Sequence, residues 1–352
     1  MAAAPKTALG TEPFWINTED WHTAGEPFRI VSELPAGSLP DGPSVRERRQ
    51  KIVSTPGHTL DQLRQILCHE PRGHADMYGG FVTPGDDEGA HFGVLFWHKD
   101  GFSTACGHGT IALGFWAVAN GIVKAPADGT TDVVIDVPSG RCTARVTTKA
   151  GRPVAADFIN VHSRQLVPKI SVPVASLGKP LDVDLTFAGA MYATLDVRQL
   201  GNLDVVASNV NTFIALGREI KGEMLKGQLP YDLYGVIFYQ ETSPDFNGTV
   251  SQRNVTIFAD GQVDRSPCGS GTCARLASLY AEGRIKSPSD RLNHGSIIGS
   301  QFVAGIVSTG DDPLTQKHGI FPMVSGRAGL CGKMQFYIDA NADEVYPGFL
   351  LR

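Results

Sequence analysis

Short apolar runs broken by glycine and proline dominate the hydrophobic pattern of this chain. Forty glycines and 22 prolines punctuate the sequence, which indicates many turns. Apolar positions at helical spacing are rarer, and they are clearest over Val210–Lys226. Runs with the length and composition of strands are Val133–Val137, Leu181–Leu185, Gly235–Tyr239 and Gln335–Ile338. We therefore predict an α+β fold with a largely antiparallel sheet rather than a doubly wound fold.

One arrangement occurs twice: an apolar strand, a tight turn, a cysteine and a helical run. Cys106 precedes the helical run Ile111–Ala119, and Cys268 precedes Ala274–Glu282. Both cysteines open a C-G-x-G-T-x-A motif, and the two copies lie 162 positions apart. The sequence therefore predicts two homologous halves, each with a cysteine just before a helix N-terminus.

A weaker echo supports the duplication. Gly25 ends a Thr-Ala-Gly segment 81 positions before Cys106, and Gly189 ends a Phe-Ala-Gly segment 79 positions before Cys268. Similar spacing before each cysteine is expected if one half was copied into the other.

The position of the cysteines has a chemical consequence. The first turn of a helix leaves backbone N–H groups without helical partners, and the macrodipole adds about half a positive charge there. Such a site holds a carboxylate and lowers the pKa of a thiol from about 8.5. Two such thiols on opposite sides of one α carbon would form a two-base racemase, with one thiolate as base and one thiol as acid.

Several segments of the chain resemble the signature blocks of the proline racemase family and follow the family's order. They are Asp20–Pro27, Glu70–Gly79, Cys106–His108 and Asp264–Thr272. The resemblance extends to the closing Gly348–Leu351 and so spans most of the chain. It implies a diaminopimelate epimerase-like fold: two similar pseudo-symmetric domains, each a mostly antiparallel sheet wrapped around a central helix, with the active site in the interdomain cleft.

The offset of the repeat and the prolines of residues 161–173 predict a linker there. We expect an N-terminal half over residues 11–172, which carries Cys106, and a C-terminal half over residues 173–342, which carries Cys268. The resemblance implies that a last strand, over residues 343–352, returns to the N-terminal half.

The resemblance also implies roles for individual residues. Cys106 and Cys268 would be the catalytic acid and base, without pyridoxal phosphate, any other cofactor or a metal. The residues implied to bind the substrate are Gly107, His108, Gly269 and Ser270 through backbone N–H groups on its carboxylate, Asp264 and His108 on its ring nitrogen, and Tyr78 and Phe258 as aromatic walls.

The retained thiols favour one activity within the family. Relatives that dehydrate trans-3-hydroxyproline typically have threonine in place of the second cysteine or serine in place of the first, whereas both positions are cysteine here. We therefore expect a racemase or 2-epimerase of proline or hydroxyproline. The alternatives are a trans-3-hydroxy-L-proline dehydratase and a non-catalytic amino-acid-binding relative. The hydroxyls of Tyr78 and Ser103 favour a hydroxylated ring, unless Tyr78 bonds to the backbone.

Other reactive residue types favour structural roles. We expect His22 and His74 to fix loops through hydrogen bonds, and Arg72 to pair with a carboxylate. The remaining cysteines share no metal-binding spacing, and we expect them to be inert; they are Cys68, Cys142, Cys273 and Cys331.

Composition indicates an enzyme that acts on a small molecule. A net charge of −5 over 352 residues, without long runs of one sign, gives no reason to expect nucleic acid or a membrane as a partner. Residues 1–10 resemble a flexible tail and are too short for a signal peptide. Two thiols that must stay free favour the cytoplasm, and a homodimer is a candidate assembly.

Overall fold

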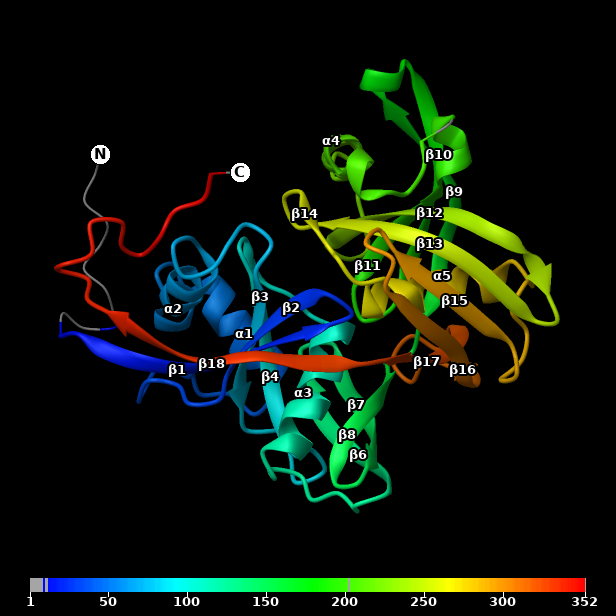
Figure 1. The fold of residues 1–352 in the computed structure, drawn as a ribbon. Coiled ribbons are helices and arrows are strands. Elements are labelled where there is room, and N and C mark those ends of the chain that lie inside the picture. The colour runs from blue at the N-terminus through cyan, green and yellow to red at the C-terminus, as the bar shows by residue number, and fades with distance from the viewer. Residues whose placement is uncertain (1–8, 10–11, 202, 352) are drawn as a thin grey trace.

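The computed structural model describes residue 9 and residues 12–201 and 203–351. These residues form two similar halves on one continuous mixed sheet, which is mostly antiparallel (Figure 1). The predicted α+β fold with two pseudo-symmetric halves is confirmed. Apart from Leu9, the expected N-terminal tail over residues 1–10 lies outside the described residues.

The elements of the first half run to residue 159. They are β1 (Phe14–Thr23), β2 (Glu26–Val31), α1 (Val45–Ser54), α2 (Thr59–Cys68), β3 (Tyr78–Thr83), β4 (Phe92–His98), β5 (Gly101–Phe102), α3 (Gly107–Ala119), β6 (Gly129–Val137), β7 (Gly140–Lys149) and β8 (Arg152–Ile159).

The remaining elements follow from residue 164. They are β9 (Arg164–Val174), β10 (Lys179–Phe187), β11 (Met191–Asp196), α4 (Val210–Met224), β12 (Leu233–Phe246), β13 (Thr249–Phe258), β14 (Gln262–Val263), α5 (Gly269–Ala281), β15 (Arg291–Ser296), β16 (Gln301–Asp311), β17 (His318–Gly326) and β18 (Ala328–Ile338). Three short 3₁₀ turns lie at Ala175–Leu177, Val197–Leu200 and Ala207–Asn209.

The order of strand pairing repeats between the halves. In the first, β1-β2-β3-β4-β6-β7-β8 pair in turn, parallel at β2–β3 and β4–β6 and antiparallel elsewhere. In the second, β10-β11-β12-β13-β15-β16-β17 pair in the same sequence of directions. The halves join where β8 pairs antiparallel with β17. The duplication predicted from the cysteine motif is therefore present in the topology.

Each half gives one strand to the other. After β8 the chain continues into β9, which pairs with β10, and after β17 it continues into β18, which pairs with β1. Figure 1 shows β18 running back along β1. The predicted linker over residues 161–173 is wrong, because most of it is β9; this strand lies at the end of the sheet, where prolines such as Pro168 and Pro173 cost little.

The expected C-terminal strand over residues 343–352 is also misplaced. The return to the first half is made by β18, which ends at Ile338. In the described part of the tail, Phe349 makes only an isolated bridge with Glu70.

The two echoing glycines occupy equivalent turns. Gly25 (φ +95°) joins β1 to β2, and Gly189 (φ +82°) joins β10 to β11. Each turn touches the opposite half, since a Cβ on Gly25 would meet Ile298 and a Cβ on Gly189 would meet Ala105. The two halves are therefore packed reciprocally around their interface.

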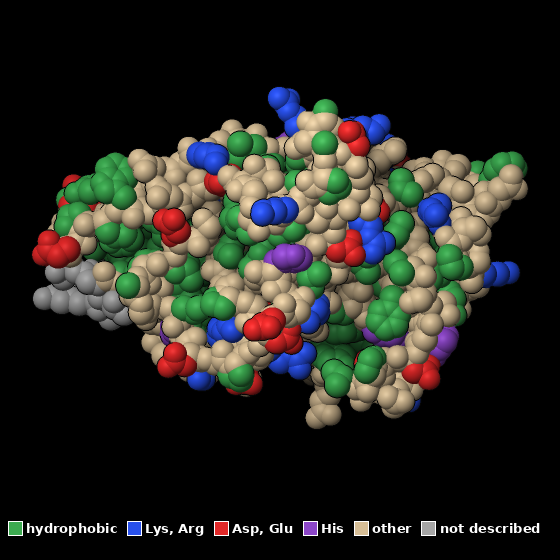
Figure 2. All heavy atoms as spheres, turned by 90° about the horizontal axis from the view of Figure 1, so that it is seen from below, with side chains coloured by type: hydrophobic (Ala, Val, Ile, Leu, Met, Phe, Trp, Pro, Cys, Tyr) green, Lys and Arg blue, Asp and Glu red, His purple; other side chains and the backbone are tan. Residues whose placement is uncertain are grey.

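The helices α3 and α5 lie inside the molecule. Residues 107–117 of α3 and residues 269–279 of α5 are all buried, and the largest hydrophobic cluster contains side chains of both helices. The predicted helix over Val210–Lys226 is α4, whereas α1 and α2 were not predicted. On the face shown in Figure 2, basic and acidic side chains are interspersed rather than grouped by sign. No helix among the described residues is long and apolar enough to cross a membrane.

Candidate active site

The two repeated cysteines cap the two central helices. Cys106 is the N-cap of α3 and its Sγ accepts the N–H of Gly109 at 3.3 Å; Cys268 is the N-cap of α5 and its Sγ accepts the N–H of Gly271 at 3.3 Å. Each cysteine is 5% exposed. Both thiols therefore lie at the positive end of a helix, enclosed by protein.

The N-termini of α3 and α5 meet head to head. A Cβ built on Gly107 would lie 2.7 Å from Cα of Gly269, and one built on Gly269 would lie 2.6 Å from Cα of Gly107. Only glycine allows this approach. The unpaired N–H groups of both first turns therefore converge at the interface of the halves, where they can hold one carboxylate.

Aromatic side chains surround this junction. The ring of Tyr78 lies 5.0 Å from that of His108 and 5.9 Å from that of Phe258. Burial raises the pKa of Tyr78, and both Cys106 and Cys268 raise it further, so both thiols lie within electrostatic reach of one phenol. The structure thus brings together the predicted residues of both halves.

The hydroxyl of Tyr78 bonds to side chains rather than to the backbone. It pairs with Oγ of Ser103 and accepts the hydroxyl of Tyr234 at 3.2 Å. Tyr234 also stacks on Phe258 at 5.4 Å. These hydroxyls form a polar edge on an otherwise apolar wall.

Asp264 and Ser270 lie beside the second thiol. Asp264 accepts both the N–H and the hydroxyl of Ser266, at 2.8 and 2.7 Å. Burial raises the pKa of Asp264 to about 6. The hydroxyl of Ser270 bonds to that of Tyr192 at 2.6 Å, and Tyr192 lies 3.8 Å from Sγ of Cys268.

Sequence reasoning missed Tyr192 and Tyr234. By strand register, the counterpart of Tyr78 is Gly235: Tyr78 pairs with His98 at the end of β4, and Gly235 pairs with Phe258 at the end of β13. Tyr234 precedes Gly235 at an irregularity between β11 and β12, and its hydroxyl donates to that of Tyr78. The repeated Tyr-Gly pair at 78–79 and 234–235 was the available signal.

The thiols differ from the expected state in one respect. Burial raises the pKa of both Cys106 and Cys268, and the N–H bonds from Gly109 and Gly271 oppose this only in part. The expectation of a lowered pKa is wrong for this closed arrangement, because desolvation of a thiolate outweighs the helix terminus. Burial also lowers the pKa of His108 to about 3, so its ring is neutral at pH 7.

The residues expected to be structural behave accordingly. His22 accepts the N–H of Gly25 at 3.3 Å, His74 accepts the N–H of Asp76 at 3.2 Å, and Arg72 pairs with Asp343. Within the described ranges, no group of three or more His, Cys, Asp or Glu side chains could hold a metal. The other cysteines carry no disulfide; Cys331 is exposed, and the buried ones are Cys68, Cys142 and Cys273.

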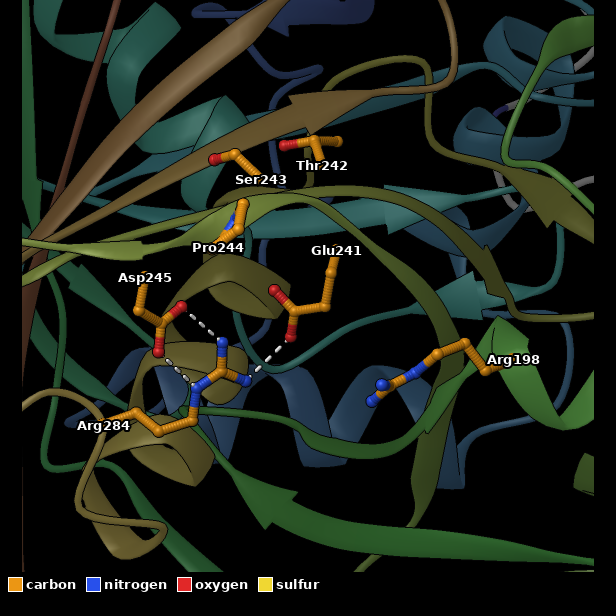
Figure 3. A pocket seen from close by; sticks show the side chains of 7 residues that line it. All are labelled: Arg198, Glu241, Thr242, Ser243, Pro244, Asp245 and Arg284. Atoms are coloured by element: carbon orange, nitrogen blue, oxygen red, sulfur yellow. Dashed lines mark hydrogen bonds and ion pairs between the residues drawn. The ribbon is translucent and has the colours of Figure 1, made fainter.

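Two open pockets elsewhere contain no thiol. A pocket of about 650 Å³ on the second half contains no thiol, and its Arg284 is already paired with Glu241 and Asp245 (Figure 3). A groove of about 700 Å³ runs between the halves and also contains no thiol; it reaches Ala190 and Thr104, which lies two positions before Cys106. The enclosed junction of α3 and α5 is therefore the candidate site.

One known protein family matches nearly the whole chain. Residues 19–350 match the family model for proline racemase. The chain belongs to the proline racemase family. Three relatives illustrate the range of this family.

A trans-L-3-hydroxyproline dehydratase of Xenopus tropicalis is 35% identical over 96% of this chain and 95% of its own length. A proline racemase of Acetoanaerobium sticklandii is 33% identical over 95% of this chain and 98% of its own. The crystal structure of a hydroxyproline epimerase from Agrobacterium vitis, with bound trans-4-OH-L-proline, superimposes with a TM-score of 0.86 at 27% identity, covering 96% of each chain. Members of the proline racemase family similar to this chain thus include both isomerases and dehydratases.

Proposed function

We propose that this protein is a cofactor-independent racemase or 2-epimerase of proline or hydroxyproline, with Cys106 and Cys268 as its two acid–base groups. The observation that carries the proposal is the head-to-head meeting of α3 and α5, each capped by a thiol. Two sulfurs at facing helix N-termini suit proton removal from one side of an α carbon and proton delivery from the other.

The substrate carboxylate would rest on the N–H groups at the start of both helices, those of Gly107, His108, Gly269 and Ser270. The ring nitrogen of the substrate would donate to Asp264 and to the neutral ring of His108. Tyr78 and Phe258 would enclose the ring.

One thiolate then takes the α proton while the opposite thiol gives its own proton to the other face. The product leaves with inverted configuration, and the thiolate now resides on the second sulfur, so protons and charge balance. The fixed N–H donors stabilise the negative charge that develops on the substrate during transfer.

The test is solvent exchange at the α carbon. In D₂O, both enantiomers of proline and both 2-epimers of 4-hydroxyproline should acquire deuterium while optical rotation decays to the equilibrium value. trans-4-Hydroxy-L-proline is the first substrate to test, because the Agrobacterium vitis epimerase was crystallised with it. Absence of exchange with all of these substrates would refute the proposal.

Dehydration of trans-3-hydroxy-L-proline is the second candidate, because relatives named for that reaction are 35–36% identical to this chain over nearly its whole length. One thiolate would remove the α proton and the opposite thiol would protonate the departing 3-hydroxyl, so that water leaves and a pyrroline forms. Mass and absorbance measurements on this substrate separate the two reactions, since racemisation leaves the mass in H₂O unchanged. Ligand affinity without exchange or elimination would indicate a binding protein instead.

We also propose a cytoplasmic location, in which the free thiols persist.

A further inference from the structure

The candidate site is closed in this structure. Cys106 and Cys268 are each 5% exposed and Asp264 is 3% exposed. A substrate can reach such enclosed thiols only after protein groups have moved aside, and separation of the two halves would uncover both thiols. The contacts that align the two halves in the closed state therefore determine the position of each thiol relative to the other.

One short segment of the second half is held by two carboxyl groups of the first. The N–H of Arg265 donates to Oε2 of Glu26 at 2.7 Å. The guanidinium of Arg265 bonds to Oδ2 of Asp76 at 2.8 Å, and the N–H of Val263 donates to Oδ1 of Asp76 at 3.1 Å. These bonds hold Val263 and Arg265, the residues on both sides of Asp264.

The same segment leads directly to the second thiol. Oδ1 of Asp264 accepts two bonds from Ser266, and Oγ of Ser266 accepts the N–H of Cys268 at 3.1 Å. Cys268 has φ +64°, a conformation that residues with side chains adopt rarely. Its backbone therefore depends on this chain of hydrogen bonds to hold it.

The energetics of Glu26 do not suit a purely structural role. It is fully buried, and its Oε1 has no hydrogen-bond partner. Its burial together with the nearby Asp264 and Asp76 raises its pKa. A buried, half-satisfied carboxyl costs free energy in the closed state, and Glu26 would regain water whenever the halves part.

We propose that Glu26 and Asp76 form a latch on residues 263–265 of the second half, and that this latch positions Asp264 and Cys268 against Cys106 each time the halves close. Glu26 and Asp76 are positioning residues, since they act through Arg265 and Val263. The inference rests on the proposed function for its kinetic consequences, but not for its structural ones.

The experiment measures opening and catalysis separately. Iodoacetamide alkylation of Cys106 and Cys268, followed by peptide mass analysis, reports how often the site opens. Asp76→Asn and Glu26→Ala should each be alkylated about tenfold faster than wild type, because the first weakens the bond to the guanidinium of Arg265 and the second removes the acceptor of the Arg265 N–H. Their kcat for deuterium exchange should fall by up to about 100-fold, through misplacement of the thiols, with a smaller change in KM.

Two further variants separate loss of the latch from a general effect of substitution. Glu26→Gln still accepts the N–H of Arg265 and should restore both measurements toward wild type. Asp132→Asn breaks an exposed ion pair with Arg145 inside the first half and should change neither. A general loss of stability would lower Tm without a selective rise in alkylation of the folded protein.

Wild-type alkylation rates in both Asp76→Asn and Glu26→Ala would overturn the latch, as would Glu26→Gln behaving like Glu26→Ala. If the wild type exchanges no deuterium, the proposed function fails, while the alkylation rates still decide the latch.

Discussion

The two cysteines occupy equivalent positions but have different backbones. Cys106 is extended (φ −156°, ψ 102°), whereas Cys268 has φ +64° and ψ 114°. Asp264 raises the pKa of both thiols, but only for Cys268 is it the largest cause after burial. The two thiols are therefore not interchangeable, even though the proposed reaction uses both.

Replacing either thiol by hydroxyl should stop racemisation. We expect Cys106→Ser and Cys268→Ser each to lose measurable change in optical rotation, because a serine hydroxyl is far too weak an acid to serve in both roles. One variant can still exchange or eliminate from a single face, and mass spectrometry of each enantiomer in D₂O would detect it. Wild-type racemisation in either variant would contradict the assignment.

The buried carboxyl of Asp264 makes a pH-dependent contribution to stability. Its pKa is raised to about 6 in the folded chain, against about 3.9 when unfolded, so the folded state binds the proton more tightly. The carboxyl therefore lowers the free energy of unfolding as the pH rises from about 4 to 6. Asp264→Asn should be more stable than wild type at pH 8, by on the order of 2 kcal/mol.

The advantage of Asp264→Asn should shrink to less than about 1 kcal/mol at pH 4, where Asp264 is neutral in the folded chain and about half ionised in the unfolded chain. Urea unfolding of the two proteins at both pH values measures the difference. An equal gain at both values would show that the effect is not due to ionisation.

Among the contacts between helices, the one between α3 and α5 should tolerate substitution least. In Gly107→Ala the new Cβ would lie 2.7 Å from Cα of Gly269 and 2.8 Å from its carbonyl carbon, both backbone atoms that cannot rotate away. The helices must then separate, and we expect kcat to fall about 100-fold. The matched control is Gly222→Ala in α4, where a Cβ would meet nothing within 4 Å.

Gly222→Ala should leave kcat unchanged and raise stability by up to about 1 kcal/mol, because alanine favours a helix over glycine. Steady-state kinetics and thermal unfolding of both variants make the comparison. Normal kcat in Gly107→Ala would mean that the helices do not meet as closely as the structure places them.

The sequence predicted those elements whose signal is local. The duplicated motif placed α3 and α5 and their cysteine caps, and the apolar spacing of residues 210–226 placed α4. It did not reveal α1, because the buried face of that helix includes Arg48, which is satisfied by carbonyls of Gly42 and Pro84 that only the fold brings near.

The same limit applies to the site. Cys106, Cys268 and Asp264 stand in recognisable motifs. Glu26, although inside a signature block, gained a role only when the fold placed it against Arg265. Tyr234 gained a role only when the fold placed its hydroxyl against that of Tyr78. No local sequence pattern predicts a contact between residues more than 150 positions apart.

At the scale of the whole molecule, a ligand that touches both halves should stabilise the closed form. Pyrrole-2-carboxylate is planar and mimics the flattened carbanion, so we expect competitive inhibition and a Tm that rises with its concentration. At 100 times its Kd the gain should be about 2.7 kcal/mol. It should also protect Cys106 and Cys268 from alkylation; inhibition without protection would place its binding elsewhere.

The exchange of β9 and β18 means that neither half completes its own sheet. A polypeptide of half the length would leave the edge of its first strand bare until a second copy supplied the missing one, so two copies would interlock as an obligate pair with identical thiols. When the two copies are joined in a single chain, the two thiol positions no longer have to be identical. One thiol position can then mutate while the other is kept, which gives a covalently fused pair access to one-sided chemistry that a symmetric pair of identical chains cannot reach.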